Sequence, residues 1–164
     1  MSGFTIRRVR PQDLDACHAL EACCFPPAEA ASRESIATRI ARFPEAFLVA
    51  EAGGAVVGHV NCGATRKDDI TDEAFKALVG HDPAGPNLVV FSLATAPDWR
   101  GRGVAAALMA RLVAEARARG RGRVLLLCKE HLKDFYRGLG FADGGPSASA
   151  HGGAAWREMR LDLG

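Results

Sequence analysis

The sequence predicts an α/β protein with a central mixed sheet and helices on both faces of that sheet. Two observations carry this prediction. In the first half, two strand-like runs flank Gly53-Gly54, a pair typical of an antiparallel hairpin. In the second half, strand, helix and strand follow one another, which is typical of a parallel βαβ unit. No linker, repeat or low-complexity segment interrupts the chain, so we expect a single domain over residues 1–164.

The elements of the N-terminal half follow from turn chemistry and apolar periodicity. Proline is tolerated in the first turn of a helix and ends one elsewhere, so Pro11 opens a helix and Phe25-Pro26-Pro27 stops it. Ser32 is a plausible N-cap for a second helix. The expected elements are a strand at 5–9, a helix at 11–23 with Leu14, Ala16, Cys17 and Leu20 on its apolar face, a helix at 33–42, and strands at 47–52 and 55–61.

The C-terminal half is marked by its glycines and prolines. The run at 88–95 is almost continuously apolar, so both faces of that strand should be covered. Gly120 and Gly140 are typical helix stops. The expected elements are a short helix at 72–79 capped by Thr71, a loop at 80–87, strands at 88–95 and 123–128, helices at 104–119 and 131–139, a strand from Phe141, a turn at Gly144-Gly145-Pro146 and a last strand at 154–161.

Composition excludes several classes of protein. The chain is 48% hydrophobic and 24% charged with a net charge of +2, so it lacks the strong basic excess expected of a nucleic-acid binder. No apolar run has the length of a membrane span, and the first residues lack the apolar core of a signal peptide. We therefore expect a cytoplasmic monomer or homodimer with neither nucleic acid nor membrane as partner.

The cysteines indicate free thiols. The five residues have neither the spacing of a metal site nor a C-x-x-C pair, and their number is odd. They are Cys17, Cys23, Cys24, Cys62 and Cys128. We expect no bound metal.

The segment from Ser92 to Ala107 predicts a phosphate-binding loop. An apolar strand leads into a basic, glycine-rich turn and then into a long helix, whose first amides and positive dipole end attract anions. Gly101 and Gly103 let the backbone approach such an anion, and Arg100 and Arg102 add positive charge. The loop has neither the Lys-Ser/Thr of a Walker A sequence nor the third glycine of a dinucleotide fingerprint.

The pattern R-x-x-G-x-A, formed by Arg100, Gly103 and Ala105, resembles the acetyl-CoA pyrophosphate loop of the GNAT N-acyltransferase superfamily. Downstream, the segment from Lys133 to Phe141 resembles the "A-x-x-F-Y-x-x-x-G-F" segment of the same superfamily. The resemblance implies the GNAT fold, with the sheet splayed between the parallel strands at 88–95 and 123–128. It also implies acetyl-CoA as co-substrate.

The resemblance assigns roles to particular residues. Tyr136, the only tyrosine, stands at the family's general-acid position and would protonate the CoA thiolate. A backbone N–H at Leu93 or Ala94 would stabilise the thioester oxygen. The residues expected to bind acetyl-CoA are Leu93, Ala94, Thr95, Arg100, Gly101, Arg102, Gly103, Val104, Ala105 and Ala106.

Four further features can be compared within the superfamily: Phe25 before a Pro-rich loop, Ser92-Leu93-Ala94-Thr95, Leu127-Cys128 followed eight residues later by Tyr136, and Trp156-Arg157-Glu158-Met159. In these features the chain is similar to arylalkylamine N-acetyltransferases of the non-vertebrate type. The amine pocket of that family would fall on Phe25, Pro27, Val90, Phe91, Leu127 and Trp156, which are apolar or aromatic. Val89 and Phe91 stand where the vertebrate enzymes carry two histidines, so the proton acceptor is open. The candidates are His131, His151, Glu130, Glu158 or a chain of waters.

Two alternatives remain open at this point. A GNAT enzyme for polyamines, aminoglycosides or protein N-termini could use the acidic segment with Asp68, Asp69, Asp72 and Glu73 to hold ammonium groups. A non-catalytic acyl-CoA-binding module is the other, and the retained Tyr136 argues against it.

Overall fold

The computed structural model describes residues 3–164. Its contacts divide the described chain into two compact units. Unit 1 contains the chain up to Cys62 together with Ser92–Leu112, and unit 2 contains Gly63–Phe91 and Val113–Gly164. The chain passes between the units inside three elements: β3 (Ala55–Thr65), β4 (Asn87–Thr95) and α3 (Val104–Ala118).

Seven strands form one mixed sheet in the order β1-β2-β3-β4-β5-β7-β6. The remaining strands are β1 (Thr5–Arg8), β2 (Phe47–Ala52), β5 (Arg123–Cys128), β6 (Ala142–Pro146) and β7 (Arg157–Asp162). β1 with β2, β2 with β3, β5 with β7, and β6 with β7 pair antiparallel, whereas β4 and β5 pair parallel. The predicted mixed sheet is therefore confirmed.

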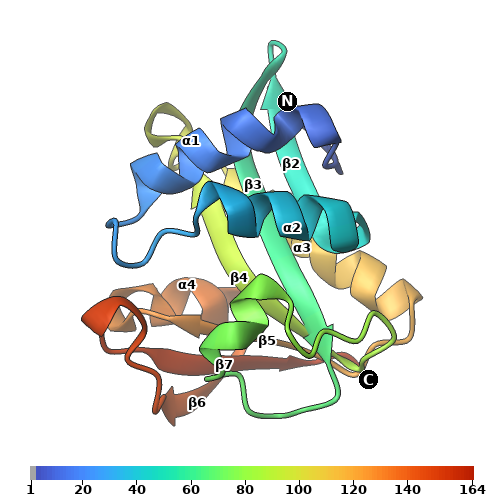
Figure 1. Ribbon diagram of the computed structural model, residues 1–164, viewed down its shortest axis with the longest axis vertical. Coiled ribbons are helices and arrows are strands. Elements are labelled where there is room, and N and C mark those ends of the chain that lie inside the picture. The colour runs from blue at the N-terminus through green and yellow to red at the C-terminus, as the bar shows by residue number, and fades with distance from the viewer. Residues whose placement is uncertain (1–2) are drawn as a thin grey trace. The chain divides into compact units, whose positions relative to one another are not determined.

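In unit 1, two helices lie side by side over β2 and β3 (Figure 1). They are α1 (Leu14–Cys24), preceded by the 3-10 turn η1 (Pro11–Asp13), and α2 (Arg33–Arg42). The hydroxyl of Ser32 accepts a hydrogen bond from the Ser35 amide at 3.1 Å, which confirms the predicted N-cap. Buried side chains of α1 and α2 form one apolar cluster with residues before and in β2. The members from the helices are Cys17, Ile36 and Ile40, and the others are Val9, Phe47 and Val49.

The first turns of α3 cover the opposite face of β3. A Cβ placed on Gly58 would lie 2.7 Å from Cγ1 of Val104, so glycine is required for this close approach. Neighbouring residues of a strand point to opposite faces. His59 and Asn61 accordingly face the α1–α2 side, where Asn61 bonds to Arg39 of α2. Helices on both faces are thus confirmed for the strands of unit 1.

Unit 2 is built on the parallel ladder between β4 and β5. Its register runs from Asn87 opposite Arg123 to Val90 opposite Leu126, and β4 continues to Thr95 while β5 continues to Cys128. The helix α4 (Lys133–Gly138) follows the 3-10 turn η5 (Glu130–Leu132). Gly120 adopts φ 75° directly after α3, as expected of a helix stop.

The predicted turn at Gly144-Gly145-Pro146 is wrong, because these residues belong to β6. The strand accommodates them through an irregularity between Asp143 and Gly145, where Gly145 has φ 91°. The last strand also starts later than predicted, at Arg157, after the 3-10 turn η6 (His151–Gly153). Serine hydroxyls explain this: Ser147 accepts from the Ser149 amide and Ser149 from the His151 amide, which favours turns over a strand.

Two expectations in the helices also need correction. The short helix at 72–79 is the 3-10 turn η3 (Glu73–Ala77), and its N-cap is Asp72 rather than Thr71, because the Asp72 carboxylate accepts from the Ala74 amide at 3.0 Å. Ala16, predicted on the apolar face of α1, is exposed. In residues 3–164, no helix has the length and apolar character needed to cross a membrane.

Candidate functional site

The predicted phosphate-binding loop is an open turn ahead of α3. Gly101 and Gly103 have φ of 76° and 83°, a conformation that L side chains rarely adopt. A Cβ at either glycine would meet nothing within 4 Å, and Arg100 and Arg102 are exposed. Val104, the first residue of α3, is buried and fixes the start of the helix. The loop can present backbone amides and two guanidinium groups to an anion.

Neighbours within unit 1 hold the ends of this loop. The guanidinium of Arg102 lies 4.6 Å from the centre of the Trp99 ring, a cation–π contact. One nitrogen of Arg100 lies 3.7 Å from the Cys24 sulfur at the end of α1. The Cys24 thiol in turn lies 3.3 Å from the carbonyl oxygen of Thr95. The last turn of α1 is therefore joined to the end of β4 and to the loop.

The expected acetyl-CoA residues on β4 differ in exposure. Leu93 and Thr95 are half-buried, whereas Ala94 is buried. Ala105 and Ala106 are half-buried in the first turn of α3. The Ala96 amide donates to the Val57 carbonyl at 2.8 Å, which fixes the backbone where β4 ends.

Tyr136 lies in α4 and is buried within unit 2. Its ring packs edge-on against Phe135 at 5.1 Å and against Phe141 at 5.8 Å. Burial, with a smaller contribution from Cys128, raises the pKa of Tyr136 above its usual range. The hydroxyl therefore stays protonated at neutral pH, as a proton donor must.

Two of the predicted amine-pocket residues join one apolar cluster in unit 2. Phe91 and Leu127 pack against a buried set formed by Ile70, Phe75, Val89 and Leu125. The rings of Phe75 and Phe91 meet edge-on at 5.1 Å. A Cβ at Gly63 would lie 2.7 Å from the Phe91 ring and 2.9 Å from the Phe75 ring, so Gly63 makes room for this pair.

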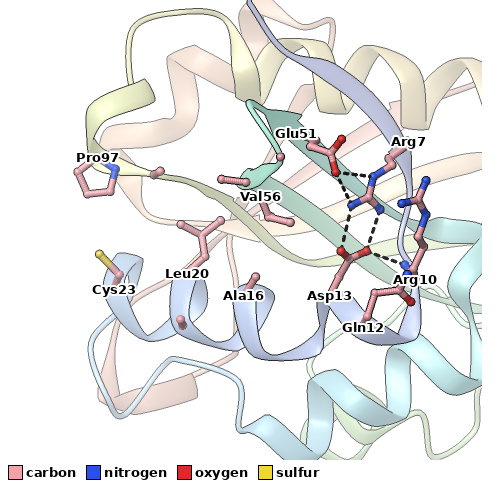
Figure 2. A pocket seen from close by; sticks show the side chains of 14 residues that line it. Arg7, Arg10, Gln12, Asp13, Ala16, Leu20, Cys23, Glu51, Val56 and Pro97 are labelled. Atoms are coloured by element: carbon pink, nitrogen blue, oxygen red, sulfur yellow. Dashed lines mark hydrogen bonds and ion pairs between the residues drawn. The ribbon is translucent and has the colours of Figure 1, made fainter.

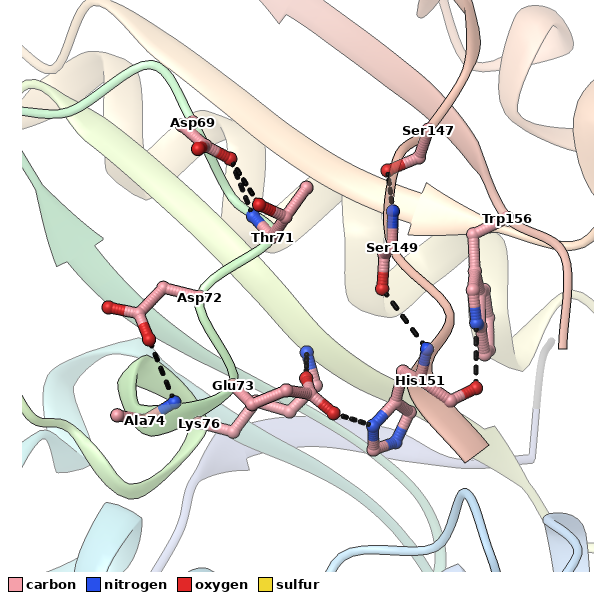
Figure 3. A network of polar contacts seen from close by, with 10 residues as sticks. All are labelled: Asp69, Thr71, Asp72, Glu73, Ala74, Lys76, Ser147, Ser149, His151 and Trp156. Atoms are coloured by element: carbon pink, nitrogen blue, oxygen red, sulfur yellow. Dashed lines mark hydrogen bonds and ion pairs between the residues drawn. The ribbon is translucent and has the colours of Figure 1, made fainter. Parts of the chain in front are cut away.

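The other predicted pocket residues lie elsewhere. Val90 precedes Phe91 in β4 and so points to the opposite face of the strand. The indole N–H of Trp156 donates to the His151 carbonyl at 2.9 Å (Figure 3). The Lys129 ammonium lies 5.7 Å from the Trp156 ring. In unit 1, Phe25 is half-buried and caps α1, and Pro27 is exposed.

The carboxylates that the sequence offered for binding several ammonium groups make contacts with nearby residues (Figure 3). Glu73 pairs with His151, and Asp69 accepts from the Thr71 hydroxyl at 2.7 Å. Although burial opposes it, the hydrogen bond from His151 and the charge of Lys76 lower the pKa of Glu73. Asp68 pairs with Arg123 at 3.1 Å. Together with the capping role of Asp72, these contacts assign the four carboxylates to the structure of unit 2.

The proton acceptors considered from the sequence are near the surface. Glu130 pairs with Lys133 and Arg157, each at 3.0 Å, and these contacts, led by the hydrogen bond from Lys133, lower its pKa. His131 is exposed. His151 is engaged with Glu73, and Glu158 is half-buried in β7.

A buried polar cluster in unit 1 escaped the sequence analysis. Glu21, Arg39, His59, Asn61 and Ser92 are each at most 5% exposed. The Ser92 hydroxyl bonds to Glu21, the His59 ring lies 3.7 Å from the same carboxylate, and Arg39 donates to Asn61 at 2.9 Å. Two signals could have revealed it: polar residues alternate at 59 and 61 in an otherwise apolar strand, and Glu21 lies one helical turn after the buried Cys17.

Burial sets the protonation states in this cluster. It lowers the pKa of His59 to about 4, with help from the charge of Arg39, so the imidazole is neutral at pH 7. It also lowers the pKa of Arg39 to about 10, which leaves the guanidinium charged. Nε2 of His59 is buried without a hydrogen-bond partner among residues 3–164.

The cysteines of the described chain differ in burial. All five cysteines are free, and burial raises the pKa of Cys128 to about 11. Cys23 is exposed in the last turn of α1. Among the described residues, no group of three or more His, Cys, Asp or Glu side chains could hold a metal ion.

Unit 1 also carries a groove of about 690 Å³ beside α1 (Figure 2). At one end, Arg7 pairs with Asp13 at 2.8 Å and with Glu51 at 2.9 Å. The other end is apolar or weakly polar and includes Leu20, Cys23 and Pro97. The charged side chains of Arg7, Asp13 and Glu51 at the first end are paired with one another.

The chain is similar in sequence to known proteins. The model of the acetyltransferase (GNAT) family matches residues 14–141. An uncharacterized N-acetyltransferase of Bacillus subtilis, YkwB, is 27% identical over an alignment of 118 residues; the match covers 65% of this chain and 52% of that protein. The chain thus spans about half the length of this curated relative.

Solved structures share the fold. A GNAT-like decarboxylase, GphF, in complex with isobutyryl-CoA superposes with a TM-score of 0.82 at 24% identity, over 98% of this chain and 100% of that one. A GNAT superfamily phosphinothricin acetyltransferase from Sinorhizobium meliloti, in complex with acetyl-CoA, gives a TM-score of 0.73 at 20% identity, over 99% and 89% of the two chains.

Proposed function

Because the chain belongs to the acetyltransferase (GNAT) family, we propose that it transfers the acetyl group of acetyl-CoA to the nitrogen of a small primary amine. The observation that carries this proposal is the open loop before α3. Its two left-handed glycines and two exposed arginines suit a pyrophosphate group. The acetyl-CoA bound to the Sinorhizobium relative supports the choice of co-substrate.

The residues at the end of β4 would bind the remainder of the co-substrate. A pantetheine arm carries amides, which can pair with strand backbone as an added strand does. The half-buried Leu93 and Thr95 offer backbone groups for this pairing. A backbone amide at Leu93 or Ala94 would donate to the thioester oxygen as negative charge develops on it.

An ammonium substrate first loses one proton to give the attacking amine. The amine attacks the thioester carbon; the new C–N bond forms, the C–S bond breaks, and the nitrogen loses a second proton as the amide forms. That second proton replaces the one delivered to the departing thiolate. Tyr136, whose hydroxyl is protonated at neutral pH, would give its proton to the departing CoA thiolate.

We propose an aromatic or apolar group on the amine. The apolar cluster around Phe91 and Leu127 supports this choice, because a ring is bound by burial at about 25 cal/mol per Å². A second ammonium group needs a carboxylate of its own. The acidic side chains at 68–73 are engaged with partners inside unit 2, which disfavours polyamines.

An assay of CoA release against a panel of amines tests this function. Phenethylamine and tryptamine should exceed spermidine and a short peptide by at least about tenfold in kcat/KM, since one uncompensated charge costs more than about 1.4 kcal/mol. Phe91→Leu should raise the KM for phenethylamine more than the KM for butylamine. A preference for spermidine would reject the aromatic acceptor, and no release of CoA with any amine would reject the transferase.

A further inference from the structure

We propose that Glu21 is a positioning residue that holds the segment 25–32, between α1 and α2, against β4 and so sets the binding of the acceptor amine. This rests on the proposed function, because that segment contains Phe25 and Pro27, which the family resemblance assigns to the amine. All groups in the argument belong to unit 1.

The carboxylate of Glu21 uses each oxygen for a different element. Oε1 accepts a hydrogen bond from the hydroxyl of Ser92 in β4. Oε2 accepts from the backbone amide of Ala31 at 2.9 Å, at the far end of the segment. The side chain is only 2% exposed, so water does not compete for these bonds.

Ala31 also packs against the apolar cluster of unit 1, and the backbone hydrogen bonds inside the segment are local. Pro26 and Pro27 have no backbone donor, and the internal bonds run from the Glu29 and Ala30 amides to the Pro26 carbonyl, each at 2.9 Å. These bonds close a local turn without joining the segment to a strand. The bond from Ala31 to Glu21 joins it, through the carboxylate, to Ser92, which directly precedes Leu93.

The charges around Glu21 agree with a role as a double acceptor. The His59 ring lies 3.7 Å from the carboxylate and is neutral at pH 7. The buried charge that balances the carboxylate is Arg39, which bonds to Asn61. Glu21 is therefore held by a hydroxyl and an amide, both of which place it between the segment and the strand.

A glutamine at this position separates positioning from proton transfer. Its carbonyl oxygen can accept from the Ala31 amide while its NH2 donates to the Ser92 oxygen, so both bonds survive in Glu21→Gln. A glutamine cannot take a proton from the substrate. An alanine loses both bonds, and Ser92→Ala loses one.

Steady-state kinetics with acetyl-CoA and phenethylamine test the proposal. Glu21→Ala should raise the KM for phenethylamine at least tenfold and Ser92→Ala by a smaller factor, with kcat and the KM for acetyl-CoA within about threefold of the wild type. Glu21→Gln should restore the amine KM to within about threefold. Asp13→Ala is the matched control: it removes another buried carboxylate of unit 1, one paired with Arg7, and should lower the melting temperature without raising the amine KM.

Hydrogen exchange of the same variants tests the anchoring without turnover. Exchange at the Ala31 amide should accelerate at least tenfold in Glu21→Ala, and much less in Glu21→Gln and Asp13→Ala. A loss of kcat in Glu21→Gln equal to that in Glu21→Ala, with KM unchanged, would overturn positioning in favour of proton transfer. Unchanged exchange at Ala31 in Glu21→Ala would overturn the anchor itself. A wild type that acetylates no amine would reject the proposed function, whereas faster exchange would still support the anchor.

Discussion

Each unit buries an apolar cluster, but the groups buried beside it differ. Unit 1 encloses charged and polar groups, with Glu21, Arg39 and His59 each at most 3% exposed. Unit 2 encloses an apolar cluster around Phe75 and Phe91 in which the contacts are ring edges and aliphatic side chains. Hydrogen bonds are directional and costly when broken, whereas apolar burial depends on area and shape. The hydrogen bonds of unit 1 therefore fix the positions of its buried side chains. The apolar contacts of unit 2 place fewer directional constraints on the groups that pack there.

The largest test of this contrast removes one charge from unit 1. Arg39→Met should lower the free energy of unfolding by about 3–5 kcal/mol, because the Glu21 carboxylate then stays buried without its balancing charge. The double variant Arg39→Met with Glu21→Gln should recover part of this loss. Urea unfolding of the wild type, Arg39→Met, Glu21→Gln and the double variant measures these changes. A double variant that loses the sum of the two single changes would contradict the coupling.

Unit 2 should respond in the opposite way to the loss of a polar group. Tyr136→Phe removes a buried hydroxyl among aromatic rings, so stability should change little, while kcat for acetyl transfer should fall about a hundredfold. This corresponds to about 2.7 kcal/mol in the barrier. Stopped-flow or steady-state measurement of CoA release gives kcat, and an unchanged kcat would make Tyr136 a packing residue.

A smaller expected effect is a dependence of stability on pH that arises from His59 in unit 1. The pKa of His59 is about 4 in the folded protein and about 6.5 when unfolded, so the unfolded chain takes up the proton first as pH falls. The stability that His59 contributes above pH 6.5 is lost between pH 6.5 and 4, by about 2 kcal/mol at pH 5. His59→Gln should remove most of the slope between pH 7 and 5. A slope unaffected by this substitution would place its origin in another group.

Much of the fold was predictable from local signals. Ser32, Gly53-Gly54 and Gly120 mark a cap, a hairpin and a helix stop, and each lies where the structure has that feature. The C-terminal segment was less predictable because Gly145 adapts a strand to an irregularity, and Ser147 and Ser149 bond to nearby amides. Those effects depend on strand pairing and on side-chain geometry, which cannot be inferred from residues considered one at a time.

Candidate site residues could be proposed from the sequence where a local motif suggests the chemistry. The glycine loop and Tyr136 were proposed because the spacing of their motifs is local in the sequence. The polar cluster was missed because Glu21, His59 and Ser92 come from three distant segments that only the fold brings together. Conversely, Val90 and Phe91 were predicted to share a pocket, although neighbours in a strand point to opposite faces.

Binding of acetyl-CoA tests the central claim most directly. With acetyl-CoA at about a hundred times its dissociation constant, the wild type should gain about 2.7 kcal/mol of stability, seen as a clear rise in melting temperature. Gly103→Asp should abolish the rise, because it places a side chain and a negative charge at a left-handed position of the open loop. The free variant should still melt cooperatively, since Gly103 is exposed. No rise in the wild type at millimolar acetyl-CoA, or an equal rise in the variant, would contradict the assignment of the loop.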